Sequence, residues 1–148
     1  MRIAFLSDEP AEIHAKLREI LVERGHEIHE FGAIASGKEC PWVPAAEEAA
    51  LAVASGRCDE GLFLCWTGTG VCMVANKVGG IRAALCTDPE TAAGARVWNH
   101  ANVLCLSNRS LTPNQALRIL DAWFDTVPGD KGADGVRQLQ VLDGKRCL

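Results

Sequence analysis

The sequence has no basic excess, no long apolar run and no paired-cysteine motif, and each absence argues against a class of function. With 148 residues, a net charge of −4 and no basic run, nucleic acid is not an expected partner. No apolar stretch approaches the roughly 20 residues that a membrane span needs, so no membrane association is expected. The apolar start, Met1 to Leu6, is too short for a signal sequence and meets Asp8 at once, so we expect a first strand and a cytoplasmic protein.

The seven cysteines include no Cys-x-x-Cys pair, which argues against a thioredoxin-like site or a zinc ribbon. An odd number of cysteines without a secretory signal favours reduced thiols, and we expect Cys58, Cys86 and Cys105 to be small core residues. The four histidines lack metal-ligand spacing with any cysteine, so no metal site is predicted.

Short apolar runs alternate with amphipathic segments along the chain, and 48% of the residues are hydrophobic against 23% charged. This alternation predicts one α/β domain over residues 1–148, with a five-stranded parallel sheet and helices on both faces. The predicted strands span residues 2–6, 27–31, 61–65, 81–85 and 101–106. The predicted helices span residues 10–24, 43–54, 71–78, 89–97, 113–125 and about 132–142, with a loop over residues 32–41.

Ligands of such sheets lie beyond the carboxyl ends of the strands, where the strand order reverses. The most informative of these positions is the turn Cys65 to Gly70, which follows a buried strand and opens a helix. Gly68 and Gly70 allow a tight turn whose backbone N–H groups point toward a ligand. A thiol beside a set of N–H donors suits a reaction in which negative charge develops on oxygen.

The residues at the strand ends carry a family resemblance. The chain resembles type B ribose-5-phosphate isomerases, in the superfamily that includes galactose-6-phosphate isomerase subunits. The resemblance covers Met1 to about Thr126 in consistent order. It rests on Ser7-Asp8, Cys65-x-Thr67-Gly68-x-Gly70, residues 75–85, residues 99–104 and Arg109. It implies a Rossmann-like α/β/α sandwich in three layers, a homodimer that completes each site with the neighbouring subunit, and no cofactor.

The resemblance also implies roles for individual residues in aldose–ketose isomerisation through an enediolate. Cys65 would be the base that moves a proton between C1 and C2. Thr67 and the amides of Gly68, Thr69 and Gly70 would bind the enediolate oxygen. The remaining implied contacts are those of Asp8 and Asn99 to sugar hydroxyls and of Arg109 to phosphate or distal hydroxyls. We interpret Asn76 and Lys77 as structural residues.

The sequence departs from the family within the site. Glu9 stands where the family usually has histidine, and Trp66 where it has glycine. Trp98 replaces the histidine that helps to open the sugar ring, so either His100 takes over this role or the substrate is open-chain. A carboxylate repels a phosphate dianion in a poorly solvated site. We therefore hypothesise a sugar substrate other than ribose 5-phosphate: shorter, modified or unphosphorylated.

Three tryptophans map onto the predicted pocket: Trp42, Trp66 and Trp98. An indole offers a face on which sugar C–H groups stack and one N–H donor. The alternative is that these side chains pack a subunit interface, whereas Trp123 is expected in the core.

Two alternatives to an isomerase remain open at this point. The first is a non-catalytic sugar-binding or regulatory protein on the same fold, which the changes at Glu9 and Trp98 favour. The second is a thiol-reactive protein that uses Cys65 with Cys72 as the resolving partner. Whether a dimer assembles further into a tetramer is also open.

Overall fold

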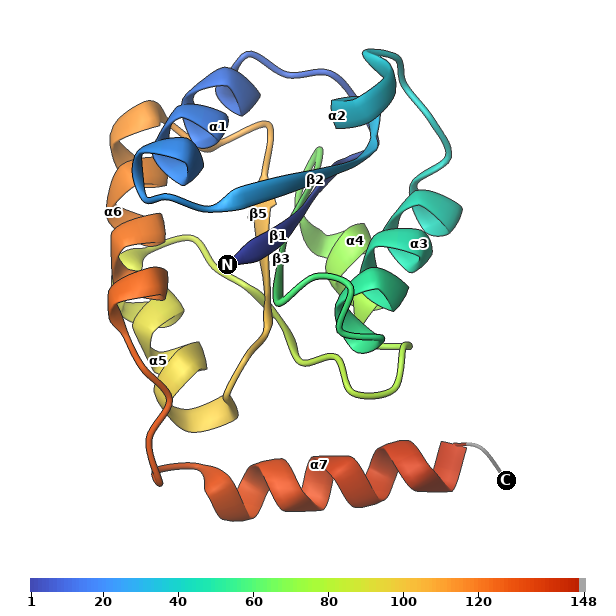
Figure 1. Ribbon diagram of the computed structural model, residues 1–148, viewed down its shortest axis with the longest axis vertical. Helices are drawn as coiled ribbons and strands as arrows, with labels where there is room; N and C mark the ends of the chain where they lie inside the picture. Colours follow the sequence, from blue (N-terminus) through green and yellow to red (C-terminus); the bar gives the residue numbers. More distant parts are fainter. Residues whose placement is uncertain (147–148) are drawn as a thin grey trace.

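A computed structural model describes residues 1–146 as a five-stranded parallel sheet with helices on both faces (Figure 1). The strands are β1 (Arg2–Ser7), β2 (Glu27–Gly32), β3 (Glu60–Cys65), β4 (Ala83–Leu85) and β5 (Val103–Ser107). The helices are α1 (Ile13–Glu23), α2 (Ala33–Ser36), α3 (Trp42–Ala54), α4 (Thr69–Ala75), α5 (Pro89–Asn99), α6 (Pro113–Asp125) and α7 (Ala133–Arg146). The predicted fold class is confirmed.

The strand order is β2-β1-β3-β5-β4, with every neighbouring pair parallel. The chain moves outward from β1 to β2 and then returns to form β3 on the other side of β1. The strand order therefore reverses between β1 and β3, and this reversal lies at the carboxyl ends that precede Asp8 and Trp66.

Alternate residues of the central strands pack into two separate cores. Leu62 and Leu64 of β3 join the core under α1, α5 and α6, whereas Phe63 and Cys65 join the core under α3 and α4. Figure 1 shows these two groups of helices on opposite sides of the sheet. Because successive strand residues face opposite sides, this alternation directs Cys65 toward α4.

Several element boundaries differ from the sequence-based predictions. The predicted loop over residues 32–41 contains the short helix α2, bracketed by Gly32 and Gly37, whose φ angles are +58° and +70°. Strand β4 begins at Ala83 rather than residue 81, because the Arg82 N–H donates to the side chain of Asn102 at 2.8 Å. The predicted helix over residues 71–78 spans Thr69–Ala75 instead.

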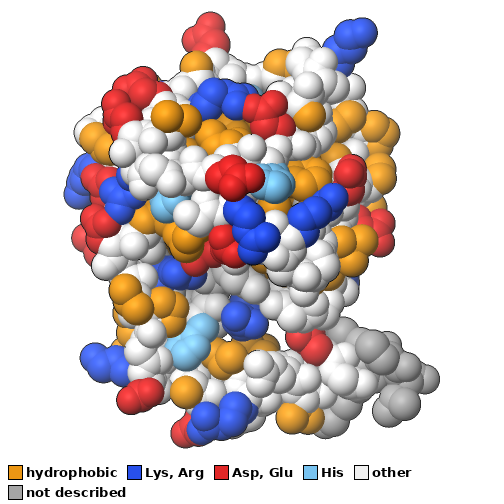
Figure 2. Space-filling model, viewed as in Figure 1, with side chains coloured by type: hydrophobic (Ala, Val, Ile, Leu, Met, Phe, Trp, Pro, Cys, Tyr) orange, Lys and Arg blue, Asp and Glu red, His pale blue; other side chains and the backbone are white. Residues whose placement is uncertain are grey.

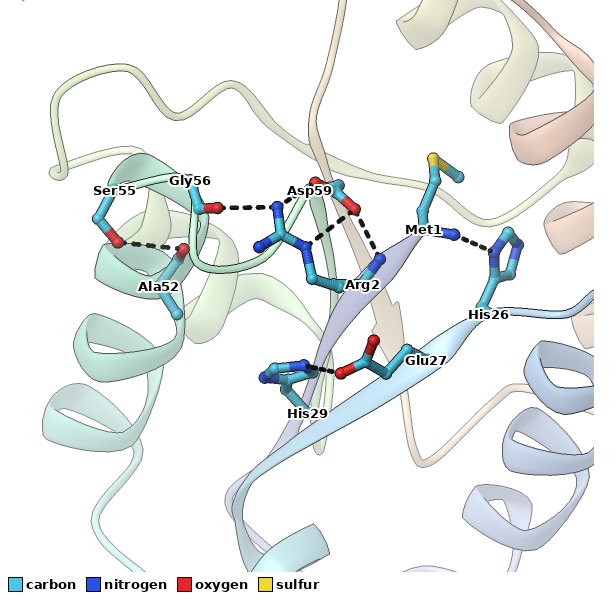
Figure 3. A network of polar contacts seen from close by, with 9 residues as sticks. All are labelled: Met1, Arg2, His26, Glu27, His29, Ala52, Ser55, Gly56 and Asp59. Carbon is cyan, nitrogen blue, oxygen red and sulfur yellow. Dashed lines mark hydrogen bonds and ion pairs between the residues drawn. The ribbon is translucent and has the colours of Figure 1, made fainter.

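A network of polar contacts lies at the end of the sheet where the strands begin (Figure 3). The Arg2 guanidinium donates to Asp59 at 2.7 Å and to the Gly56 carbonyl at 2.9 Å, which joins β1 to the turn before β3. These bonds from Arg2 lower the pKa of Asp59 to about 2.

Behind this edge lies a buried ion pair between Glu60 and Arg96, with an N···O distance of 2.7 Å. The Trp123 indole N–H donates to the other oxygen of Glu60, also at 2.7 Å, and Trp123 lies in the core as predicted. This cluster fastens β3 to α5 and α6.

Helix α7 lies across the amino edge, far from the loops that follow the carboxyl ends of the strands (Figure 1). Figure 2 shows a hollow between α7 and the body of the molecule. A cavity of about 320 Å³ there is lined in part by Arg82, Asn99, Leu139 and Asp143. Within residues 1–146, no helix has the length and apolar character to cross a membrane.

Candidate active site

The candidate active site forms where the carboxyl ends of β1, β3 and β5 lie side by side. The strand register pairs Ser7 with Leu64, and Cys65 with Ser107. Asp8 and Cys65 therefore leave neighbouring strands at the same edge. The Asn108 N–H donates to the Cys65 carbonyl at 2.9 Å, which ties the two strand ends together.

The turn after Cys65 is held by the chain that follows β5. The Trp66 carbonyl accepts from the Arg109 N–H at 3.1 Å and from the Ser107 hydroxyl at 2.8 Å. These bonds place Arg109, an exposed predicted site residue, directly beside the turn.

Gly68 gives the turn its shape. Its φ angle is +77°, and a Cβ atom there would lie 2.8 Å from the Leu106 carbonyl oxygen, so only glycine fits without strain. Gly68 is also the N-cap of α4, whose first helical bond runs from the Cys72 N–H to the Gly68 carbonyl. The amides of Thr69, Gly70 and Val71 consequently have no carbonyl partner within the helix.

Thr67 and Thr69 complete the polar surface of this turn. Their hydroxyl groups are hydrogen-bonded to each other at 2.6 Å, and both residues are exposed. The turn thus offers two hydroxyls together with the amides of the first turn of α4. The thiol of Cys65 lies beneath it, with only 7% of the residue exposed.

Asp8 presents an unsatisfied carboxylate at this edge. Its Oδ1 atom is buried and has no hydrogen-bond partner among the described residues. Burial raises the pKa of Asp8, and the neighbouring carboxylates of Glu9 and Glu39 raise it further. An unpartnered buried oxygen is costly in the free protein and is well suited to accept a hydrogen bond from a ligand hydroxyl.

Two of the three predicted tryptophans also lie at this edge. Trp42 packs its ring against Gly70, since a Cβ atom at Gly70 would be 3.1 Å from the indole. Trp66 belongs to the turn itself and is 58% exposed. Both indoles are therefore available to a ligand or to another subunit.

The remaining predicted residues, Trp98, Asn99 and His100, lie at the opposite edge of the sheet. They lie at the end of α5, just before β5 begins. Cys65 instead pairs with Ser107, the last residue of β5. The His100 ring hydrogen-bonds the Lys131 carbonyl at 2.8 Å, and Trp98 lies under the Lys131 ammonium. Within one chain, these residues are not part of the Cys65 site.

Trp98 is nevertheless held in a defined position. Gly132 has a φ angle of +78°, and a Cβ atom there would collide with the Trp98 carbonyl. The segment between α6 and α7 thus packs closely on the end of α5, while Trp98 remains 57% exposed. Neither Trp98 nor Asn99 is buried by its own chain.

Cys72 is a second thiol near the turn, but it faces away from it. Its Sγ atom is 3.6 Å from the Ala83 carbonyl and 3.6 Å from the Asn76 amide nitrogen. A hydrogen bond with the Cys105 thiol lowers the pKa of Cys72 to about 7. These contacts turn Cys72 toward β4 and β5, which argues against its role as a resolving partner for Cys65.

Asn76 has the structural role that the sequence suggested. Its side-chain amide exchanges two hydrogen bonds with the backbone of Ala83, each of 2.9 Å, and so joins α4 to β4. The expected core cysteines, Cys58, Cys86 and Cys105, are all buried. Among residues 1–146, no group of three His, Cys, Asp or Glu side chains forms a potential metal site.

Sequence reasoning missed His14, which lies at this edge on α1 and hydrogen-bonds Asn108 at 2.9 Å. A single histidine on an amphipathic helix carries no signal of its own, because its partner is 94 residues away. Asn108 lies in the segment after β5, where ligand-binding residues were expected, yet its side chain had no assigned role.

Comparison with known proteins places the whole arrangement in a family. The family model described as Ribose/Galactose Isomerase matches residues 3–140. The chain belongs to this family. Among curated relatives, the ribose-5-phosphate isomerase B of Escherichia coli is 41% identical over 127 residues, 85% of each chain. The D-erythrulose-4-phosphate isomerase of Pectobacterium atrosepticum is 35% identical over 126 residues, 84% of this chain and 83% of that one.

Solved structures of the family have the same fold. A ribose-5-phosphate isomerase B of Clostridium thermocellum superposes with a TM-score of 0.86 at 35% identity and covers 99% of both chains. A type B ribose 5-phosphate isomerase of Trypanosoma cruzi gives a TM-score of 0.90 at 27% identity, with 98% of this chain and 97% of that one covered. The family resemblance drawn from the sequence and the expectation of an aldose–ketose isomerase are both confirmed.

Proposed function

We propose that this isomerase interconverts a small aldose phosphate and its ketose through an enediolate, with Cys65 as the base. The Cys65 thiolate removes the proton from C2 of the aldose and returns it to C1, while a proton moves from O2 to O1. The negative charge that develops on oxygen faces Thr67 and the amides that begin α4. This assigns the chemistry to the turn between β3 and α4.

The observation that carries the proposal is the meeting of three features at one sheet edge. A nearly buried thiol ends β3, unpaired amides follow it in the next turn, and a buried carboxylate oxygen of Asp8 lies on the adjoining strand end. A base, an oxyanion site and a hydroxyl acceptor are the groups that aldose–ketose isomerisation requires. Arg109 adds one exposed cation beside the turn for a phosphate or distal hydroxyls.

The substrate differs, in this proposal, from ribose 5-phosphate. The family contains proteins named for five-carbon and for four-carbon sugar phosphates. Glu9 places a second carboxylate next to Asp8, which disfavours a phosphate at that position. The His100 ring is already bonded to Lys131, which favours a substrate that needs no ring-opening acid.

We further propose that a second copy of the chain completes the site. Trp98 and Asn99 lie beyond the reach of Cys65 in their own chain, and their side chains remain exposed for contact with another. In a symmetric dimer, each copy would present these residues to the Cys65 of the other.

Solvent exchange tests the reaction directly. The protein is incubated in D₂O with aldoses and ketoses of four to six carbons, each with and without phosphate, and proton NMR follows the label. We expect deuterium at C1 or C2 of at least one sugar. Cys65→Ala should lower the exchange rate by a factor of about 10²–10⁴, the usual contribution of a general base.

Cys72→Ser is the matched control, because Cys72 is the neighbouring thiol with a lowered pKa. This variant should exchange label at nearly the rate of the unaltered protein. Loss of deuterium exchange in Cys72→Ser but not in Cys65→Ala would show that Cys72 is the base. A folded protein that binds a sugar yet labels none of the panel would instead favour the non-catalytic sugar-binding function.

A further inference from the structure

Asn108 holds the carboxylate of Glu9, and Ser7 holds its backbone. The Asn108 side-chain amide, at the end of β5, donates to Glu9 Oε1 at 3.2 Å. The same amide nitrogen donates to the Ser7 hydroxyl at 3.0 Å. The Ser7 hydroxyl in turn donates to the Glu9 carbonyl at 2.8 Å. Glu9 is thus bound through both its side chain and its backbone.

His14 determines which way the Asn108 amide points. The Ala11 N–H donates to His14 Nδ1 at 3.3 Å, so the ring proton is on Nε2. Nε2 then donates to Asn108 Oδ1 at 2.9 Å. Burial lowers the pKa of His14, which favours the neutral ring, whose Nδ1 can accept. With its oxygen turned toward His14, Asn108 directs its N–H groups to Ser7 and Glu9.

Asn108 also connects Glu9 to the proposed base. Its backbone N–H donates to the Cys65 carbonyl at 2.9 Å, while its side chain holds the carboxylate of Glu9. One residue therefore fixes the positions of both groups. Oε1 of Glu9 is occupied by this bond, and no described residue hydrogen-bonds Oε2.

The local charge indicates what this carboxylate would bind. Glu9 lies beside Asp8, whose pKa is raised by burial and by the charges of Glu9 and Glu39. Carboxylate oxygens accept hydrogen bonds from hydroxyl groups, but they repel a phosphate dianion. A polyhydroxylated, uncharged part of a sugar therefore fits this position better than a phosphate group.

We infer that Glu9 is a further substrate-binding residue for the uncharged, hydroxyl-bearing part of the sugar, and that His14 and Asn108 are the residues that position it. This inference deepens the proposed isomerase function and rests on it for the identity of the site. It assigns Glu9 a role in specificity that does not depend on which group is the base.

Ribitol tests the inference, because it carries sugar hydroxyls but no carbonyl and no charge, so it binds without reacting. Titration calorimetry measures its Kd, and inorganic phosphate is titrated separately. Glu9→Gln should raise the Kd of ribitol about tenfold, since a charged acceptor becomes neutral. The same change should strengthen phosphate binding several-fold, since it removes a negative charge. Glu12→Gln is the matched control on an exposed carboxylate and should change neither value.

Asn108→Asp tests the positioning role. It removes the donor and sets a carboxylate against Glu9, so it should weaken ribitol binding by at least the tenfold effect expected of Glu9→Gln. In the double variant Glu9→Gln with Asn108→Asp, an amide again faces a carboxylate, with donor and acceptor exchanged. Ribitol affinity in the double variant should therefore equal that of Glu9→Gln alone. A purely structural role for Asn108 would instead add a second loss.

Three results would overturn the inference. The first is ribitol and phosphate affinities in Glu9→Gln that match the unaltered protein. The second is a double variant in which Asn108→Asp weakens ribitol binding as much as it does when Glu9 is unaltered. The third is no ribitol binding in a protein that turns over a sugar phosphate. Failure of deuterium exchange with the expected ribitol effects intact would refute only the proposed enediolate chemistry at Cys65.

Discussion

Mixed dimers test the proposal that two copies of the chain share each active site. Cys65→Ala and Asn99→Ala should each be inactive as homodimers. When the two variants are combined, one of the two sites in the hybrid regains both residues. It takes Cys65 from one chain and Asn99 from the other, while the second site lacks both.

Cys65 and Asn99 lie far apart within one chain. Strand β5 runs from Val103 to Ser107, and Ser107 pairs with Cys65. At about 3.3 Å per residue, β5 alone is about 13 Å long, and Asn99 lies before it. Groups that act on one small sugar must both contact it, so residues this far apart in one chain cannot complete one site.

Co-expression of the two variants with different affinity tags, followed by purification over both tags, isolates the hybrid. With one intact site in two, its deuterium-exchange rate should be about half that of the unaltered dimer. The reciprocal hybrid pairs a chain carrying both substitutions with an unaltered chain. It should be inactive, because each of its sites lacks one residue.

The opposite pattern would refute the reasoning. If each chain held its own complete site, the first hybrid would be inactive and the reciprocal hybrid would be half active. A protein that is monomeric by light scattering at the assay concentration while fully active would refute a shared site as well.

The remaining predictions concern stability and are checked by thermal or urea unfolding. Asp8→Asn should stabilise the fold by about 1 kcal/mol near pH 7 while it lowers turnover, because Oδ1 is unpartnered. The pKa of Asp8 is raised in the folded protein. The stability gained by Asp8→Asn should therefore be absent below the unfolded pKa of about 3.9, and it should be complete once the pH has risen through the folded pKa. Gly68→Ala should cost about 2 kcal/mol or more, because the Cβ atom meets the Leu106 carbonyl at a positive φ. Glu60→Ala should lower the free energy of unfolding by about 3–5 kcal/mol, because it leaves the Arg96 guanidinium buried without its partner. A loss under about 1 kcal/mol in Gly68→Ala or in Glu60→Ala would contradict this reasoning.

Local sequence patterns predicted the elements that depend on neighbouring residues. Asp88 caps α5 by accepting the Thr91 N–H, and Thr112 and Gln115 form a capping box at the start of α6. The apolar run before Cys65 is a strand buried on both faces, and the glycines after it shape the turn. Such signals act over a few residues, so they are readable without the fold.

The elements that sequence reasoning missed depend on contacts across the fold. The start of β4 is set by Asn102, twenty residues along the chain, and the short helix α2 interrupts a segment whose composition indicated only a loop. No pattern near residue 82 encodes the contact with Asn102.

The sequence by itself thus determined the alternating α/β plan, the turn that carries Cys65 and the family to which the chain belongs, because periodicity and motif spacing are local properties. Only the tertiary structure decided which strand ends meet. It brought Asp8 next to Cys65 and separated both from His100, since parallel strands place the residues before and after them at opposite edges. It also joined His14 to Asn108, a pairing that exists because α1 packs beside the end of β5 and that no spacing along the chain could reveal.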